Sequence, residues 1–134
     1  MRPVWVLDTN VVISAALTSG GTCDQIFRAA VEGRIALAWS APMIAEYREV
    51  LLRPKFGFNP GTVGTFLDAF DPALQVSPLK APSLPDPDDQ VFLGTALATK
   101  DKILVTGNSN HLPTRICRPA AIYTPANALK LLSA

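Results

Sequence analysis

Short apolar runs alternate along the chain with longer stretches in which apolar residues recur every three or four positions. The runs at residues 4–7, 35–39 and 103–106 are too short for helices and are rich in β-branched, aromatic or other apolar side chains, which predicts three buried strands. Because these runs are apolar on both faces, they favour the interior of a parallel sheet. A weaker strand is predicted at residues 122–123 and a short edge strand at 74–77.

Amphipathic stretches predict helices at residues 11–17, 23–32, 42–52, 60–70, 88–99 and 126–132. Ser40 is expected to cap the third helix, and Thr22 or Asp24 the second. The second helix should bury the apolar residues of one face, Ile26, Phe27, Ala30 and Val31. Strands that alternate with helices favour an α/β fold, here a three-layer α/β/α sandwich with a central parallel sheet. The length of 134 residues favours a single domain.

Polar residues stand at the carboxyl ends of two of the predicted strands. Asp8, Thr9 and Asn10 come directly after the first, and Thr106 and Asn108 occupy the carboxyl end of the third. Ligands of open parallel sheets bind outside the carboxyl ends of the strands, so these side chains are candidates for one pocket. The alternatives are that Asp8 only caps the next helix and that the later segment is a glycine turn with polar fillers. The pattern alone leaves both interpretations open.

Two helices add acids to this set. Glu46 falls on the shoulder of the apolar stripe of the third helix, while Glu49 and Arg53 are expected to point further outward. The stripe is centred on Ile44, Tyr47 and Leu51, with Met43 and Val50 at its margins. A solvated helix glutamate is the common alternative for Glu46.

The acids of the sequence Asp86-Pro87-Asp88-Asp89 stand where a helix is predicted to begin. An N-cap acid, a proline in the first turn and further acids beside them satisfy the ordinary preferences of a helix start. Asp89, however, precedes Phe92 and Leu93 by three and four residues and so shares their core-facing side. A buried carboxylate costs several kcal/mol unless a partner compensates it, and a divalent cation is one such partner. Asp86 and Asp88 are expected nearer to solvent.

Composition narrows the chemistry. Apolar residues make up 49% and charged residues 17%, which is typical of a globular protein. No apolar run approaches the ~18 residues of a membrane span, and the N-terminal run is too short for a secretion signal, so a cytoplasmic protein without membrane contact is expected. One histidine and two cysteines without metal-type spacing give little support to Zn²⁺ chemistry. Carboxylates without histidine or cysteine are the ligands of Mg²⁺ or Mn²⁺.

The segments VLDTNVVISA and DPDDQVFLGTALATKDKILVTGN, with Glu46 between them, resemble the PIN domain family. The resemblance is closest to the VapC-like subgroup, the toxin components of toxin–antitoxin pairs. It covers nearly the whole chain and implies a single PIN-like domain over residues 1–134. It also implies a Mg²⁺ or Mn²⁺ site, hydrolysis of single-stranded RNA, a cognate antitoxin and a homodimer.

Carried over by position, the resemblance makes Asp8, Glu46 and Asp89 the catalytic acids, with Asp88 as a further metal ligand. Thr9, Asn10 and Thr106 would support the first acid. Asn108 stands where the family has a fourth acid, and Asn110 replaces a further frequent one. An amide oxygen can still ligate Mg²⁺ or bind one of its waters, but it brings no charge, so metal affinity should fall.

The asparagine at position 108 keeps a second function open, a catalytically weakened PIN module that binds RNA or an antitoxin without cleaving. A phosphatase of the haloacid dehalogenase type would need a second aspartate where Asn10 stands. A response-regulator receiver would need paired acids near the first strand, and this sequence lacks them. Should the nuclease interpretation hold, the basic residues Arg48, Arg53 and Lys55 are candidates for contacts to RNA phosphates.

Overall fold

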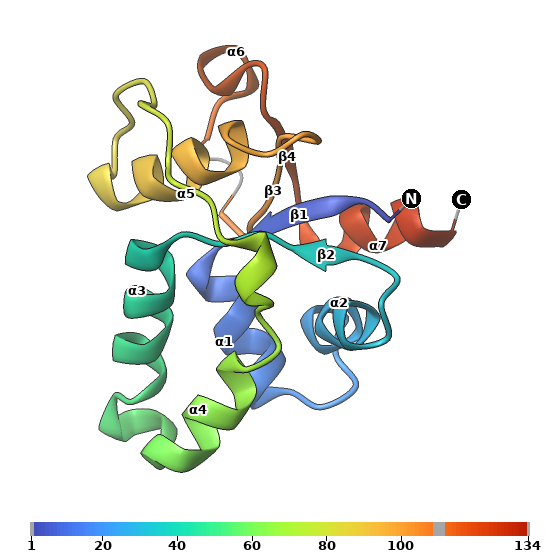
Figure 1. Cartoon of the computed structure of the whole chain (residues 1–134), viewed down its shortest axis with the longest axis vertical. Coiled ribbons are helices and arrows are strands. Elements are labelled where there is room, and N and C mark those ends of the chain that lie inside the picture. The colour runs from blue at the N-terminus through green and yellow to red at the C-terminus, as the bar shows by residue number, and fades with distance from the viewer. Residues whose placement is uncertain (1, 109–111, 134) are drawn as a thin grey trace.

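A four-stranded parallel sheet forms the centre of the molecule (Figure 1). The computed structural model describes residues 2–108 and 112–133, so the prediction for Asn110 lies outside the described residues. The strands lie in the order β2-β1-β3-β4. Their bounds are Val4–Leu7 (β1), Ala36–Leu37 (β2), Ile103–Val105 (β3) and Ala121–Tyr123 (β4). Every pairing is parallel, which confirms the predicted α/β class.

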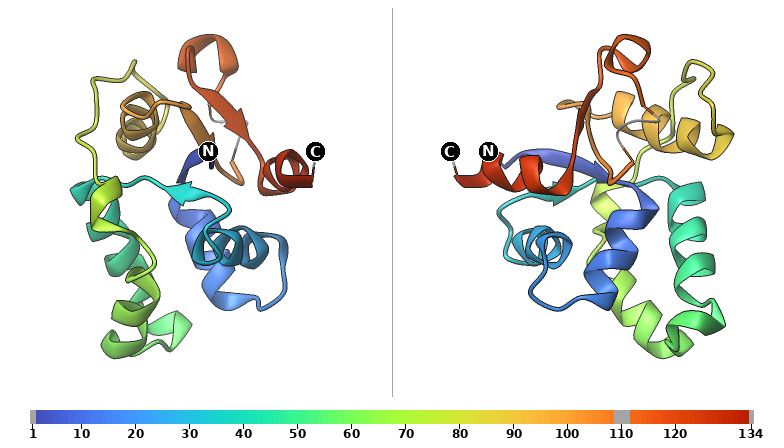
Figure 2. Two further views of the ribbon diagram at one scale, coloured as in Figure 1. Left: turned by 45° about the vertical axis from the view of Figure 1, so that its right-hand side comes forward. Right: turned by 180° about the vertical axis from the view of Figure 1, so that it is seen from behind.

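Helices cover both faces of this sheet. Their bounds are Thr9–Leu17 (α1), Thr22–Val31 (α2), Ala41–Leu51 (α3), Pro60–Leu67 (α4), Pro87–Leu97 (α5), Thr114–Cys117 (α6) and Pro125–Ser133 (α7). Two 3₁₀ turns span Pro54–Phe56 and Pro72–Leu74. The helix α5 lies on one side of the sheet and α1 to α4 lie on the other, as the two further views confirm (Figure 2). This arrangement is the three-layer sandwich predicted from the sequence. No helix within the described residues is long and apolar enough to cross a membrane.

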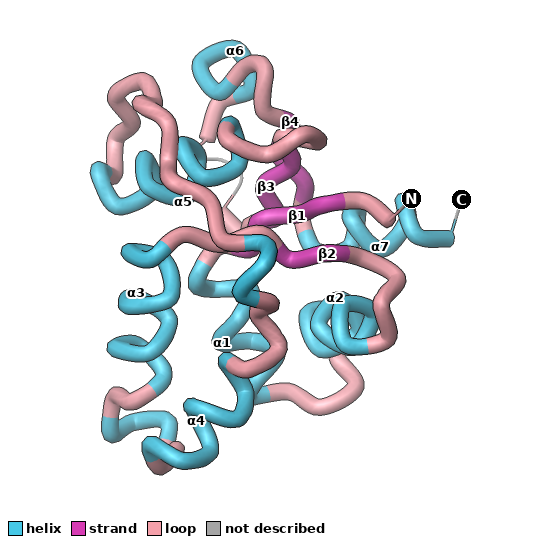
Figure 3. The backbone as a smooth tube through the Cα atoms, viewed as in Figure 1, coloured by secondary structure: helices cyan, strands magenta, loops and turns pink. Residues whose placement is uncertain are grey.

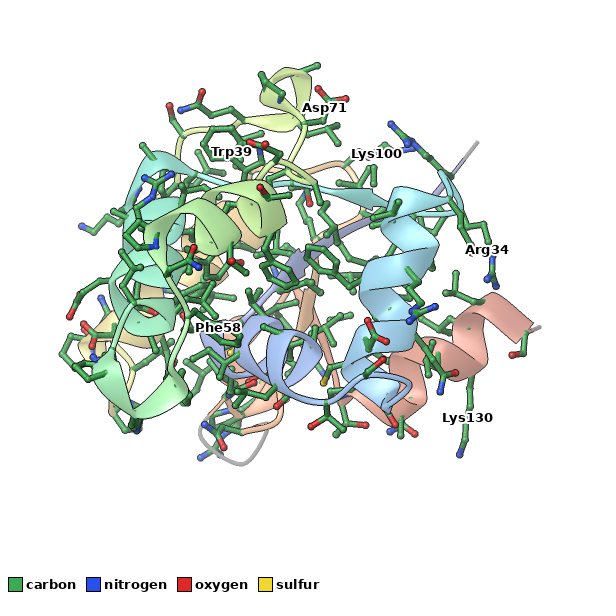
Figure 4. All side chains as sticks on the ribbon, turned by 90° about the horizontal axis from the view of Figure 1, so that it is seen from below. Arg34, Trp39, Phe58, Asp71, Lys100 and Lys130 are labelled. Carbon is green, nitrogen blue, oxygen red and sulfur yellow. The ribbon has the colours of Figure 1, made fainter. Side chains whose placement is uncertain are left out.

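The strand β1 has its predicted bounds, whereas β2 and β3 are shorter than the apolar runs that predicted them, and loops take up the remainder (Figure 3). The run at 35–39 keeps only two residues in β2. Trp39 instead forms an isolated bridge with Gln75, and its indole N–H donates to the carbonyl of Asp71 at 2.8 Å (Figure 4). The predicted edge strand at 74–77 was wrong because Leu74 closes a 3₁₀ turn that Pro72 begins. Only one bridge residue remains of that strand.

Helix ends depart from prediction where other hydrogen bonds occupy the capping side chains, a local one at Asp24 and a tertiary one at Ser40. Neither Thr22 nor Asp24 caps α2, because Gly21 is its N-cap and Asp24 binds the Gly20 N–H at 2.7 Å. On the same helix Val31 is 69% exposed, and Ala29 is buried in its place. Ser40 is the N-cap of α3 by position, but its hydroxyl bonds to that of Thr95 at 2.9 Å and so joins α3 to α5.

Smaller differences concern three other helices. On α3, Met43 is fully buried, while Ile44 is only partly so, which reverses their predicted order. The helix predicted over 60–70 ends at Leu67, and the short α6 was not predicted. Its four residues are too few to show a helical period.

The connector before α5 lies directly against Gly94. The amide of Leu79 donates to the Gly94 carbonyl at 2.9 Å, and a Cβ at Gly94 would lie 2.2 Å from the Leu79 carbonyl oxygen. Only glycine allows this approach. The missing side chain at Gly94 therefore lets the connector that leads into Asp86 pack directly against α5.

Replacing Gly94 with alanine is therefore expected to lower the free energy of unfolding by about 1–3 kcal/mol, because backbone must shift to remove the overlap. Gly64→Ala is the matched control, since Gly64 also lies inside a helix but its Cβ would meet nothing within 4 Å. That variant should be neutral or up to about 1 kcal/mol more stable. Denaturant unfolding of both measures the contrast, and equal effects would contradict it.

Candidate active site

A cleft opens at the carboxyl edge of the sheet, between the start of α1, one face of α3 and the start of α5. Its volume is about 320 Å³, in the range of small-ligand sites. The residues that line it are Asp8, Thr9, Asn10, Ile13, Glu46, Val50, Arg53, Asp86, Asp88, Asp89, Phe92 and Asn108. The structure thus brings the predicted acids and Asn108 to one place. An apolar pocket lined by Ala16, Leu51, Phe58, Thr62, Val63 and Phe66 contains no titratable side chain and offers no comparable chemistry.

Asp8 lies at the bottom of the cleft and is only 6% exposed. Its Oδ1 accepts from the Thr9 N–H at 2.7 Å at the start of α1. Its Oδ2 accepts from the Thr106 hydroxyl at 2.6 Å and from the Asn10 amide at 3.3 Å. Asp8 is therefore both the helix cap and a residue of the cleft. Burial raises the pKa of Asp8, and these three hydrogen bonds oppose the rise by favouring the charged form.

The turn after β3 is bound to the same carboxylate. Thr106 is fully buried behind Asp8, and its hydroxyl also accepts from the Asn108 N–H at 3.0 Å. The Gly107 N–H donates to the Asn10 side-chain oxygen at 3.0 Å. Asn10 and Thr106 thus hold the ends of two neighbouring strands together, which leaves the exposed Asn108 at the rim of the cleft.

One hydrogen bond ties α3 to the start of α1, and another ties it to the end of β1. The Thr9 hydroxyl donates to Glu46 Oε2, and the Tyr47 hydroxyl donates to the Leu7 carbonyl. Glu46 is half-buried, on the shoulder of α3 where the sequence predicted it. Burial raises the pKa of Glu46, and the negative charges of Asp88 and Asp8 raise it further, against the Thr9 hydrogen bond. Tyr47 was predicted only as a core residue, although a buried tyrosine hydroxyl requires a partner.

The start of α5 supplies the remaining acids. Asp86 is its N-cap and accepts from the Asp88 N–H at 3.0 Å. Asp88 is exposed and Asp89 is half-buried, in the order predicted from the helical period. The charge of Asp86 also raises the pKa of Asp8, so acids from two elements repel each other across the cleft.

A family model described as the PIN domain matches residues 4–110, which contain every residue of this cleft. The chain belongs to the PIN domain family. PIN domains are generally nucleases and typically use divalent metal ions, so the chain has a nuclease-type fold. No curated protein and no solved structure matches the chain.

The charge balance of this PIN domain suits a divalent cation. Five carboxylates line the cleft, and within the described residues Arg53 is the only basic side chain that lines it. The ion pairs between described residues do not include Asp8, Glu46, Asp86 or Asp88. These acids therefore gain no compensation from salt bridges in this part of the chain.

The carboxylates nevertheless stand apart from one another. Across the described residues, no three Asp, Glu, His or Cys side chains are grouped closely enough to hold an ion together. Mg²⁺ usually keeps several waters and binds only one or two carboxylates directly, so this donor set fits a largely hydrated hard cation. It does not fit an ion such as Zn²⁺ in a closed shell of protein ligands.

Two residues of the cleft, Asp86 and Arg53, were not predicted as part of the site of the acids. Asp86 is the exposed helix cap that the sequence predicted, and it also lines the cleft. Arg53 was predicted to point outward from α3, as a candidate only for contacts to RNA phosphates. Helical periodicity placed Arg53 as if α3 continued, but α3 ends at Leu51 and Arg53 has extended backbone angles of φ −61° and ψ 136°. The Pro54 that follows was the available signal, because the residue before a proline is driven out of the helical region.

Proposed function

We propose that this PIN domain hydrolyses phosphodiester bonds of single-stranded RNA with a bound Mg²⁺ or Mn²⁺. The observation that carries this proposal is the single cleft that holds Asp8, Glu46 and Asp89 at the carboxyl edge of the sheet. Carboxylates gathered at this position are suited to a hard cation, and a hard cation is suited to phosphate oxygens. A nuclease-type fold supports the same assignment.

In this proposal Asp8 is the central ligand, and Asp89, Asp88 and Glu46 complete a shell that is partly bridged by water. Such an ion supplies an activated water molecule and neutralises charge on the phosphate. The residues around Asp8 orient its carboxylate and favour its charged form, because Thr9 N–H, Thr106 and Asn10 all donate to it. Thr9 also orients Glu46 through its hydroxyl.

A cellular role as the toxin of a toxin–antitoxin pair is the finer part of the proposal. It is supported by the sequence resemblance of the LDTNV and DPDD segments to toxin members of the family, and it brings a cognate antitoxin and a homodimer as partners in the cytoplasm. Induced expression in bacteria should then arrest growth, and Asp8→Asn should relieve the arrest. Normal growth at high expression of the wild type would contradict the toxin role while leaving the nuclease chemistry untouched.

The chemistry is tested by incubating purified protein with end-labelled single-stranded RNA in Mg²⁺, Mn²⁺ or EDTA. Cleavage should require the ion, and RNA held in duplexes should be cut more slowly. Thermal unfolding measured in parallel should show stabilisation by Mn²⁺, because an ion that binds only the folded state raises its stability. Failure of either ion to stabilise the protein, together with intact RNA, would exclude the nuclease.

A module that binds RNA without cleaving it is the second candidate, and Asn108 favours it. This neutral side chain is exposed and lines the same cleft as the acids of α5. Metal affinity is lower when a ligand position lacks charge.

Asn108→Asp is therefore expected to tighten Mn²⁺ binding about tenfold and to leave cleavage equal or faster, because it adds one carboxylate to the cleft. Calorimetric titration gives the affinity, and the RNA assay gives the rate. Cleavage by Asn108→Asp but not by the wild type would establish the non-cleaving module. Weaker ion binding by Asn108→Asp would show that position 108 does not take part in ion binding.

A further inference from the structure

The cleft continues from the acids along one face of α3 to a basic side chain. Glu46 and Val50 line it from one side of α3, four residues apart, and Arg53 lines it just beyond the end of α3 at Leu51. Leu51, the last residue of α3, lies about 7.5 Å from Glu46 along the helix axis at the usual rise, and Arg53 follows two residues later. The described lining of the cleft thus has an acidic end at Asp8 and a basic end at Arg53.

The other basic residues of this region do not share that position. Arg48 is exposed on α3 and is absent from the cleft lining. The Lys55 ammonium lies over the Phe56 ring, 5.0 Å from its centroid, and is likewise absent from the lining. Of the three candidates for RNA contact in the sequence, the structure directs only Arg53 toward the cleft.

Arg53 has one weak partner. Its Nη2 lies 3.5 Å from Glu49 Oε1, and the two side chains are 50% and 72% exposed, respectively. Exposed pairs of this kind contribute little to stability, so the guanidinium can exchange Glu49 for another anion at small cost. A phosphate accepts two parallel hydrogen bonds from a guanidinium and is the better partner for its planar donors.

We propose that Arg53 binds a backbone phosphate of the RNA that flanks the cleaved bond, and that Glu49 competes with this phosphate in the free protein. The proposal rests on the proposed function for the identity of the substrate. Its separation from Glu46 assigns Arg53 to a flanking phosphate, because the reacting phosphate lies at the acids. Arg53 therefore sets how tightly RNA is held, and the acids set how fast it is cut.

The experiment measures binding of fluorescein-labelled single-stranded RNA by anisotropy in Mg²⁺, with Asp8→Asn present in every protein so that no RNA is cut. Arg53→Gln should weaken binding about five- to tenfold and reduce the slope of log affinity against log salt by about 0.7, the value for one phosphate contact on a single strand. Arg48→Gln removes the same charge five residues earlier, on α3, and should change affinity less than twofold.

Glu49→Gln tests the competition from the other side. It should tighten RNA binding about two- to threefold, because Arg53 loses its intramolecular partner. In a protein that already carries Arg53→Gln, Glu49→Gln should leave RNA affinity unchanged, because the arginine that it would release is absent. A gain that persists in the double variant would overturn the competition and assign the effect to general charge.

Two outcomes separate this inference from the proposed function. Equal losses for Arg53→Gln and Arg48→Gln would overturn the inference, even if the wild type cleaves RNA. Selective loss for Arg53→Gln would sustain it, even if the wild type binds RNA without cleaving. In proteins with Asp8 intact, Arg53→Gln should raise KM for a long RNA while leaving kcat unchanged, and a fall in kcat alone would contradict a binding role.

Discussion

Replacing Asp8 with asparagine is expected to slow RNA cleavage about a thousandfold, the scale on which a central electrostatic group contributes to catalysis. Asp8 is the most buried of the cleft acids, and residues that follow two strands, Asn10 after β1 and Thr106 after β3, donate to it. Loss of its charge should also abolish stabilisation by Mn²⁺ in thermal unfolding. Activity and ion binding are then lost together, which a purely structural role would not produce.

The fold should survive Asp8→Asn. Asparagine is as good a helix N-cap as aspartate, so the bond to the Thr9 N–H is retained. The Thr106 hydroxyl can rotate to accept from an amide in place of donating to a carboxylate. Because burial raises the pKa of Asp8, its ionisation destabilises the metal-free protein as pH rises through that raised value. The variant lacks this loss and should unfold at the same temperature or higher at neutral pH, whereas a large drop would refute this account.

The surroundings of Asp8 could be predicted from the sequence only in part. Apolar runs predicted the parallel sheet, and the edge at which Asp8, Thr106 and Asn108 meet follows from parallel strands alone. The hydrogen bond between Thr106 and Asp8 depends in addition on the register that sets Leu7 beside Val105. No local pattern encodes that register. The sequence therefore predicted Asp8 and Thr106 as site residues but not the hydrogen bond between them.

Side chains at helix ends show the same limit. Ser40 has the local character of a cap, yet its hydroxyl bonds to Thr95, fifty-five residues away. Arg53 has the local character of a solvated helix residue, yet the helix ends before it and the chain turns it toward the cleft. A tertiary contact decides the position of the Ser40 hydroxyl, and the end of α3 decides that of Arg53. A helical period of 3.6 residues predicts neither.

The position of Glu46 on α3 could be predicted, but its hydrogen bond could not. Helical spacing placed it at the shoulder of α3, while its bond to the Thr9 hydroxyl requires α3 to lie against the start of α1. That bond keeps Glu46 beside Asp8, where the two charges repel each other and raise the pKa of Glu46. A carboxylate held near another at this cost in free energy is typical of a functional site.

Glu46→Gln is therefore expected to slow cleavage about a hundredfold while leaving RNA affinity within a factor of about two, a change in the range for one preorganised catalytic group. The glutamine oxygen can still accept from Thr9, and Tyr47 still holds α3 to Leu7, so the variant removes charge without moving the helix. Single-turnover cleavage at saturating protein measures the effect on the chemical step.

Glu49→Gln is the matched control, since it neutralises the same residue type on the same helix, one turn further along. Glu49 is absent from the cleft lining and pairs with Arg53, so its loss should tighten RNA binding and leave the single-turnover rate unchanged. Opposite effects of two neighbouring glutamates on rate and on affinity would assign the chemistry to the Asp8 end of the cleft and RNA binding to the Arg53 end. Equal slowing by both variants would instead mean that only the total charge of α3 matters.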